Sequence, residues 1–328
     1  MKYNYNRELA KRFVSDYKLP MPIINAEIFE HHLNLYEDDY GAMSKWNDLN
    51  HFIEIKFDGN IEAFLKEYYD IRENIIQTVI NSQAYKAFNN MDMSVFAIKN
   101  KSNITSNNIY NESNVGETFL SIDLKKANFQ TLKHIDNNIV LGADTYEDFI
   151  GKFTDWDYVK TSKYTRQVIF GMMNPKRHIT AEKYFIHKIY EFVVSYYPCL
   201  NGKCVSMSTD EIIFKLDENW DVDFDLIEAW TSKNFCGFDV NVEIFKLKGY
   251  NLNFKKSGST RTTFYVKEHL DIDQEHKFRL ISAPLPYHCI IYKLYKGLEM
   301  EELDYHFDYE GIDAKFCEDF IIEEVTKK

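Results

Sequence analysis

The sequence has few residues that interrupt regular structure. Its 328 residues include only 12 Gly and 6 Pro, whereas 16% of them are aromatic. This composition disfavours a loop-rich or linker-rich protein and favours long helices and strands with bulky packing. No apolar run approaches the length of a transmembrane helix, and the first residues lack the apolar core of a secretory signal. We therefore expect a globular intracellular protein that does not contact a membrane, located in the cytoplasm, or in that of a host cell if its source is viral.

Paired cysteines are also lacking. The chain has 5 Cys, an odd number, with no C-x-x-C pair, at Cys199, Cys204, Cys236, Cys289 and Cys317. This spacing disfavours both a structural zinc site and a disulfide framework. It agrees with a reducing compartment.

Positive charge is scarce overall, since the net charge is −12. A protein that simply coats nucleic acid is normally basic, so a general phosphate-binding surface is disfavoured. Acidic residues are concentrated between Asp210 and Asp225, and a group of cations follows them: Lys246, Lys248, Lys255, Lys256, Arg261 and Lys267. This order is typical of an acidic metal-binding centre beside a cationic strip, although ordinary solvated charge explains the strip equally well.

The first part of the chain, residues 1–115, is expected to be mostly helical. Apolar residues recur at helical spacing from Asn60 to Phe88. His31 and His32 are adjacent, and neighbours on a helix point about 100° apart, so we expect them not to share a metal. The polar tract at 99–114 has no periodicity and predicts a domain boundary or a long loop. Residues 1–115 would extend the nucleic-acid-binding surface or dock a protein partner.

The second part, residues 116–270, predicts the split β-α-β antiparallel sheet of a polymerase palm. Thr118 to Leu124 is an apolar run that predicts a buried strand. Helical patterns follow at 161–173 and 179–197, and then two short strands, 203–207 and 212–216, joined by the acidic turn 208–211. An amphipathic stretch, a strand from 240 and a hairpin over about 244–267 complete the predicted palm. We expect an α+β fold in which residues 271–328 form a mixed helical extension, with a helical tail from Leu285.

The carboxylates of this palm have the placement that phosphoryl transfer requires. That reaction needs positioning and charge neutralisation, which two divalent ions about 3.5–4 Å apart provide. Such ions need carboxylates on rigid neighbouring strands. Asp123 is at the end of one predicted strand, and Asp210 and Glu211 are at the turn of a hairpin that can lie beside it. The same acids also suit a surface turn, so only the whole set predicts a site.

Three segments together resemble the motifs of family A DNA polymerases. Ser121-Ile-Asp123, with Leu132 and His134 further on, is similar to motif A. Arg166, followed by Phe170-Gly171, is similar to the fingers helix K-x-x-x-F-G, and Ser208-Thr209-Asp210-Glu211-Ile-Ile-Phe214 resembles motif C, H-D-E-L-V-F. The resemblance covers roughly residues 116–217, and reverse transcriptases share the same palm logic.

The resemblance implies a role for each matching residue. Asp123 and Asp210 would bridge two Mg²⁺ or Mn²⁺ ions, with Glu211 as a partial ligand. Arg166 would neutralise the incoming nucleoside triphosphate, and Phe170-Gly171 would lie against the nascent base pair. Further contacts to triphosphate or template phosphates are expected at Lys163, Lys176 and Arg177. A primer-contacting hairpin would use Lys246, Lys248, Lys255, Lys256 and Arg261.

The sequence also departs from the family pattern. Asn174-Pro175 replaces Tyr-Gly, Thr209 replaces the histidine of motif C, and Asn128 replaces the motif A glutamate that excludes a ribose 2′-hydroxyl. The segment between the fingers helix and motif C is short, which implies reduced fingers. We therefore predict a small template-dependent polymerase, primase-like or reverse-transcriptase-like enzyme. Three alternatives stay open: a palm without catalytic activity in a replication or transcription complex, a palm-type cyclase, and an unrelated protein that imitates the motifs.

Overall fold

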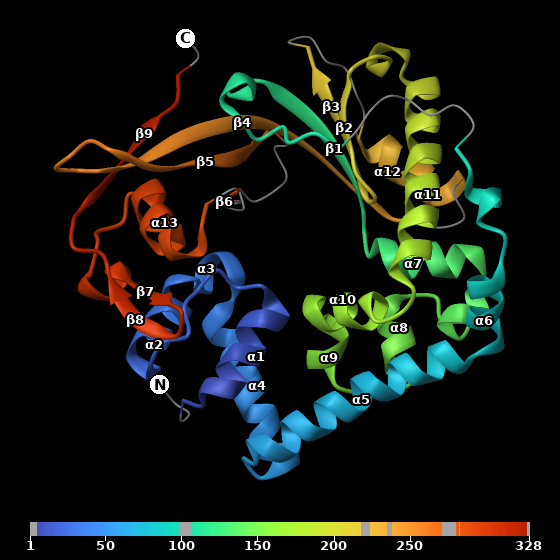
Figure 1. The fold of residues 1–328 in the computed structure, drawn as a ribbon, viewed down its shortest axis with the longest axis horizontal. Helices are drawn as coiled ribbons and strands as arrows, with labels where there is room; N and C mark the ends of the chain where they lie inside the picture. The colour runs from blue at the N-terminus through green and yellow to red at the C-terminus, as the bar shows by residue number, and fades with distance from the viewer. Residues whose placement is uncertain are drawn as a thin grey trace.

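The computed structural model describes residues 5–98, 106–217, 224–234, 238–270, 280–281 and 283–326. The fold is α+β, as predicted: a layer of helices lies beneath a large antiparallel sheet, and the C-terminal elements lie at one side of both (Figure 1). In the described parts of the chain, no helix has the length and apolar character needed to cross a membrane. Cys236 and residues 99–105 of the predicted boundary tract lie outside the described residues.

Helices make up the described N-terminal region, as predicted. They are α1 (Arg7–Tyr17), α2 (Ala26–Leu35), α3 (Glu37–Tyr40), α4 (Ala42–Phe57), α5 (Ile61–Asn81) and α6 (Gln83–Asn90). Asn6, Asn25 and Asn60 each accept a hydrogen bond from the backbone N–H three residues ahead, which fixes where α1, α2 and α5 begin. The helical pattern predicted over 60–88 is two helices, because Ser82 leaves the helical conformation and caps α6.

A second group of helices follows the first strand. It comprises α7 (Ala127–Ile135), α8 (Tyr146–Gly151), α9 (Asp157–Thr161), α10 (Lys163–Gly171), α11 (Pro175–Tyr196) and α12 (Phe224–Asn234). The helix predicted at 161–173 is α10. Ser162 caps the first turn of α10 and so separates it from α9. The helix predicted at 179–197 begins earlier, since Pro175 suits the first helical position.

The main sheet has the order β2-β3-β1-β4-β5-β6, and β9 also pairs with β4. Its strands are β1 (Thr118–Leu124), β2 (Cys204–Met207), β3 (Glu211–Leu216), β4 (Val240–Phe254), β5 (Thr260–His269), β6 (Leu280–Ile281) and β9 (Phe320–Glu324). The predicted strand over 118–124 and the β2–β3 hairpin are confirmed. The strand from 240 and the first half of the second hairpin are one long strand, β4.

Alternation along β1 separates the two faces of the sheet. Leu120 and Ile122 point to one face, where they pack with apolar residues of α11 and α12 such as Ile189 and Ile227. Ser121 and Asp123 therefore point to the opposite face. Because one face is committed to the helices, the register of β1 cannot slip by one residue without burying polar groups there.

The C-terminal region differs from the prediction. Its described helix, α13 (His288–Lys296), is followed by β7 (His306–Tyr309), β8 (Ile312–Lys315) and β9, so the expectation of a mixed helical extension is wrong beyond Lys296. The reason lies in β4, which is longer than β1. Its first half pairs with β1, and its second half offers free backbone groups that β9 pairs with at 250–254. A sequence pattern does not show such a partner.

One apolar core crosses the boundary expected near residue 115. It contains Phe13 and Trp46 from the N-terminal helices, Phe170 from α10 and Ile290 from α13. Residues 5–98 therefore share their largest core with α7–α10 and with the C-terminal helix.

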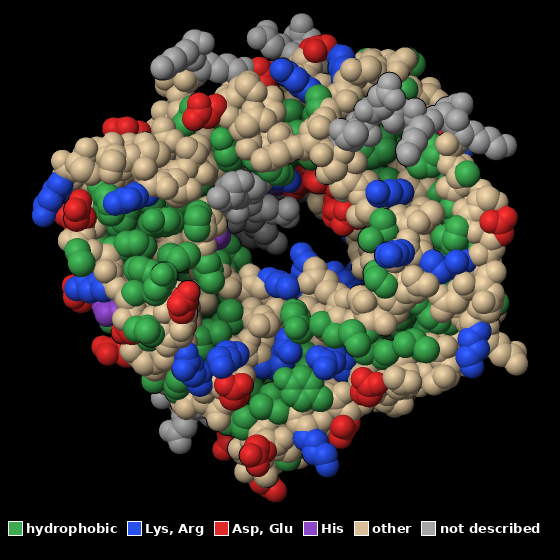
Figure 2. Space-filling model, in the orientation of Figure 1, with side chains coloured by type: hydrophobic (Ala, Val, Ile, Leu, Met, Phe, Trp, Pro, Cys, Tyr) green, Lys and Arg blue, Asp and Glu red, His purple; other side chains and the backbone are tan. Residues whose placement is uncertain are grey.

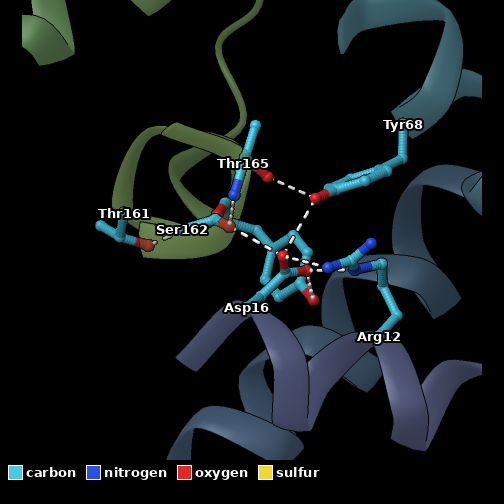
Figure 3. A network of polar contacts seen from close by, with 7 residues as sticks. Arg12, Asp16, Tyr68, Thr161, Ser162 and Thr165 are labelled. Carbon is cyan, nitrogen blue, oxygen red and sulfur yellow. Dashed lines mark hydrogen bonds and ion pairs between the residues drawn. The ribbon is translucent and has the colours of Figure 1, made fainter. Parts of the chain in front are cut away.

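A buried carboxylate joins four of these helices (Figure 3). Asp16 of α1 is fully buried and accepts two 2.8 Å bonds from the guanidinium of Arg12. The same carboxylate accepts hydrogen bonds from Tyr68 of α5 at 3.0 Å, Tyr158 of α9 at 2.6 Å and Ser162 at 2.8 Å. Ser162 also caps α10, so α10 begins at a residue that Asp16 holds.

Removing this carboxylate should destabilise the fold strongly. Asp16→Ala leaves the Arg12 charge buried without its partner, which typically costs about 3–5 kcal/mol. We expect a loss of that order in the free energy of unfolding, measured by urea denaturation. Asp157→Ala, which removes a carboxylate with 92% of its side chain exposed, should change stability by less than about 1 kcal/mol. Equal effects of the two substitutions would show that the Asp16 network is not a stabilising element.

Candidate functional site

The three predicted carboxylates come from adjacent positions in the sheet. Asp123 of β1 is the direct cross-strand partner of Glu211 of β3. The backbone N–H of Leu124 donates to the carbonyl of Asp210 at 2.8 Å, which fixes the acidic turn against the end of β1. The predicted placement of the hairpin beside the strand is therefore confirmed.

Glu211 is oriented by a neighbour on the same sheet face. The hydroxyl of Ser121, which is fully buried, donates to Glu211 Oε1 at 2.7 Å. Asp210 is held differently, because its side chain is exposed and accepts hydrogen bonds from Ser208 at 2.9 Å and Thr209 at 3.3 Å. Asp210 can therefore change rotamer at little cost, whereas Glu211 is fixed.

Two further acids lie near the predicted carboxylates, Glu243 near Asp123 and Glu182 near Asp210, and sequence reasoning missed both. Glu243 of β4 lies opposite Ser121 on the same face and is 4% exposed. It forms an ion pair with Lys267 of β5. Glu182 of α11, also 4% exposed, accepts a hydrogen bond from the Asn128 amide at 2.5 Å. One feature of the sequence could have identified Glu243, because it is the only carboxylate inside the apolar run from Val240 to Phe245. The alternation of side chains along that strand places it on the same sheet face as Asp123.

Burial and mutual repulsion change the proton affinity of the acids. Burial, together with Asp210, Glu211 and Glu243, raises the pKa of Asp123 to about 7, although Lys267 opposes the shift. Burial also raises the pKa of Glu182 to about 7, with Asn128 opposing and Asp210 adding to the shift. A cation bound near Asp123 and Glu182, in addition to Lys267, would favour the ionised form of both carboxylates and lower both pKa values.

The predicted metal ligands are not arranged as a closed metal site. Among the described residues, ligand atoms from three acidic, His or Cys side chains converge within 4.8 Å of one another at His31, Glu301 and Asp304, and not at the predicted carboxylates. The Lys293 ammonium lies 2.7 Å from both acids of that other group, and His31 Nε2 lies 2.7 Å from Asp304. This group is therefore an ion-pair network that already holds its cation.

The predicted fingers residues have mixed placements. Arg166 is half-buried, and its guanidinium lies 5.6 Å from the centre of the Tyr146 ring. Phe170 is 2% exposed within the apolar core, so its ring is not presented to a base pair as expected. Arg177 donates to the backbone carbonyl of Phe88 at 3.1 Å and to that of Met91, which makes it a tether for α6 and not a free phosphate ligand. Three other predicted contact residues are exposed: Lys163, Gly171 and Lys176.

The cationic hairpin is also divided by the strand register. Lys246 pairs with Thr118, and Lys248 follows it on the same face, so both point away from Asp123. Lys248 lies within ion-pair distance of Glu268 and Glu324, at 3.8 and 3.6 Å. At the hairpin end, Lys255 and Lys256 are exposed, and Arg261 lies 3.9 Å over the ring of Phe254. The register therefore separates Lys246 and Lys248 from the face that carries Asp123.

A central hollow separates the sheet from the helices beneath it (Figure 2). Acidic side chains lie along the sheet side of this hollow, and Lys and Arg side chains lie along the side formed by the helices. The two signs of charge thus face each other across an open space, which suits a metal-bound polyanion better than a bare one.

The pKa of Asp123 predicts how stability varies with pH in the absence of divalent ions. Its ordinary value of 3.8 applies to the unfolded chain, and the folded value is about 7. Between these values the folded chain binds the extra proton, so this group makes stability fall as pH rises to about 7. Asp123→Asn should therefore stabilise the protein by on the order of 2 kcal/mol at pH 8 in EDTA, and by much less near pH 4.5.

Urea unfolding at both pH values measures this difference. Asp144→Asn, at a side chain that is 88% exposed, is the matched control and should give the same small change at each pH. A gain from Asp123→Asn that is independent of pH would contradict the assigned repulsion.

Comparison with known proteins adds no further assignment. No protein-family profile, curated protein or solved structure matches the chain. The functional reading of the site therefore depends on the residues themselves and on the geometry described above.

Proposed function

We propose that the chain catalyses template-directed nucleotidyl transfer at Asp123, Asp210 and Glu211. The observation that carries this proposal is the register of β1 between β3 and β4. It places Asp123 opposite Glu211 on the sheet face away from α11 and α12, and the backbone of the turn residue Asp210 against the end of β1. An antiparallel sheet with helices on one face and carboxylates on the other is the arrangement expected of a palm.

The donor set fits divalent cations of the magnesium type. Carboxylate oxygens are the ligands that such ions prefer, and the raised pKa of Asp123 reflects its burial and then the neighbouring acids, which Lys267 only partly offsets. Two Mg²⁺ or Mn²⁺ ions would activate a 3′-hydroxyl and neutralise the leaving pyrophosphate. Asp210 would complete the site by exchanging its bonds to Ser208 and Thr209 for a metal bond.

The remaining residues would bind and orient the substrates. Arg166, held beside Tyr146 at the start of α10, supports the proposal as a cation for the triphosphate of an incoming nucleotide. Ser121 keeps the Glu211 carboxylate directed along the sheet, and Asn128 orients Glu182. The hollow would hold the primer and template, and exposed Lys163 and Lys176 would contact their phosphates.

A second function is favoured by two specific observations. Phe170 of α10 is buried, and Arg177 of α11 is committed to backbone carbonyls, so two predicted substrate contacts lack the free side chains that synthesis uses. These features support a palm that binds nucleic acid without extending it, as a subunit of a replication or transcription complex.

Primer extension distinguishes the two functions. With a labelled primer on DNA and RNA templates, Mg²⁺ or Mn²⁺ and each nucleotide set, we expect extension by the wild-type chain. Asp123→Ala and Asp210→Ala should each lower the rate by several orders of magnitude, because a bridging metal ligand is lost. Asp144→Ala, which removes an exposed acid, should retain the wild-type rate.

The pattern of products also identifies the template and the sugar that the enzyme accepts. Extension that persists in Asp123→Ala and Asp210→Ala would contradict the two-metal assignment. Absence of extension under all conditions, with primer–template still bound, would support the non-synthetic palm instead.

A further inference from the structure

The β4–β5 hairpin carries cations that the proposed function does not use. Between Glu243 and Glu268 the sequence contains no acidic residue, although the net charge of the chain is −12. The tip of the hairpin, residues 254–261, exposes three of these cations, which we call the tip cations: Lys255, Lys256 and Arg261. Positive charge is therefore concentrated at one protruding turn of an acidic protein.

Within the part of the chain that the structure describes, the tip cations have no ion pair. The acids beside the tip have other partners. Asp319, which precedes β9, accepts a 2.9 Å bond from the backbone N–H of Lys255 at its carbonyl oxygen, and its carboxylate accepts a hydrogen bond from Tyr305 at 3.0 Å. The carboxylate of Glu323 accepts a hydrogen bond from Asn253 at 2.7 Å. These acids are directed to neutral donors, and the tip cations keep their charge exposed to solvent.

The tip is also held in a defined shape. The backbone N–H of Phe254 donates to Ser259 at 3.1 Å, and that of Gly258 donates back to Phe254 at 2.8 Å. The guanidinium of Arg261 lies 3.9 Å over the Phe254 ring, which in turn packs on Phe320 with 4.9 Å between ring centres. A guanidinium that stacks on a ring still presents N–H donors at its edge, and it has less rotamer freedom to lose when an anion binds.

The tip is remote from the candidate site. Asp123 pairs with Asn241 near the start of β4, whereas β4 ends at Phe254. At about 3.3 Å per residue this part of the strand spans as much as about 40 Å. The end of the β4–β5 hairpin projects at the side of the molecule opposite α7 and α11 (Figure 1). An anion bound at the tip would therefore lie well away from a strand end that reacts at the carboxylates.

We propose that the tip is an anchoring site for the phosphate backbone of a single-stranded nucleic acid, bound outside the carboxylate site and without sequence preference. The edge of the Arg261 guanidinium would contact two phosphate oxygens, and Lys255 and Lys256 would act as point charges on neighbouring phosphates. The hydroxyls of Ser257 and Ser259, which lie 2.9 Å apart, would add the uncharged donors that phosphate contacts commonly use.

The choice of nucleic acid over an acidic protein segment rests on the proposed function, whose substrate is a nucleic acid. Binding at the tip itself requires neither divalent ions nor catalysis, because its contacts come from side-chain cations and hydroxyls. The anchoring site and the carboxylate site are therefore separable by experiment.

The salt dependence of binding tests the proposal, because each phosphate that a cation neutralises releases counterions from the strand. The probe is a labelled oligothymidylate, titrated in EDTA at salt concentrations from about 50 to 200 mM. We expect saturable binding by the wild-type chain. The tip variant, which combines Lys255→Gln, Lys256→Gln and Arg261→Gln, should bind at least about tenfold more weakly at the lowest salt concentration. Its plot of log association constant against log salt concentration should be shallower by about 2, since each single-strand contact contributes about 0.7 to the slope.

A matched control variant removes the same charge from exposed lysines elsewhere: Lys66→Gln, Lys86→Gln and Lys152→Gln. These residues lie on α5, on α6 and at the end of α8, away from the hairpin (Figure 1), so this variant should keep the wild-type affinity and slope. The unfolding midpoints of both variants in urea confirm that they fold. Equal slopes in the tip and control variants would overturn the proposal, because ordinary solvated charge gives that result. Absence of saturable binding by the wild-type chain would also overturn it.

Two further measurements separate this site from its alternatives. Polyglutamate is the probe for an acidic protein segment, and it should bind more weakly than the oligothymidylate at each salt concentration. Tighter binding of polyglutamate that the tip variant loses would assign the tip to a protein partner and overturn the proposal. Asp210→Ala should keep the wild-type salt slope in EDTA, because the carboxylate site takes no part in anchoring. Failure of primer extension together with a tip-dependent slope would contradict the proposed function and support the anchoring site.

Discussion

The arrangement of the helices depends on one buried carboxylate, that of Asp16. It accepts hydrogen bonds from side chains of α1, α5, α9 and the residue that caps α10, and its charge is balanced by Arg12. A buried charge with this many donors is tolerated only in one geometry, because the loss of any partner leaves an uncompensated group. The position of α10, which carries Arg166, therefore follows from a contact made by the first helix of the chain.

Buried acids in this protein fall into two groups. Asp16 and Asp304 are surrounded by cations and donors; despite burial, the bonds from His31 and Lys293 lower the pKa of Asp304 to about 2. Asp123 and Glu182 have the opposite shift, to about 7. The first group stabilises the fold, whereas the second destabilises it in the absence of a cation. Acids retained at such a cost are candidates for function, since structural roles alone would not require them.

Helix α7 lies between the candidate site and a neighbouring cavity. It follows β1, which carries Asp123, and its Asn128 contacts Glu182 while Phe129, Lys133 and His134 line a cavity of about 400 Å³. The Tyr146 ring lies within 6 Å of two cations, Lys126 on the cavity side and Arg166 on α10, at 5.8 and 5.6 Å.

The sequence by itself determined the α+β class, the limits of β1, the β2–β3 hairpin and the juxtaposition of Asp123 with Asp210 and Glu211. These features follow from local signals: an apolar run, a turn rich in Ser, Thr and Asp, and the short span of a hairpin. Asp123 and Glu211 become cross-strand partners as soon as the β2–β3 hairpin pairs with β1.

The tertiary structure decided everything that depends on which face or partner a residue meets. Pairing of β4 and packing of α11 place Glu243 and Glu182 near the predicted carboxylates. Lys246 and Lys248 lie on the other face of the sheet, because side chains alternate along β4. Phe170, a residue of the fingers motif, is part of the core, and Arg177, a flanking cation, ties α11 to the backbone of Phe88 and Met91. The strand β9 pairs with the part of β4 that extends beyond β1. Each outcome depends on contacts between segments distant in the chain, which local periodicity does not encode.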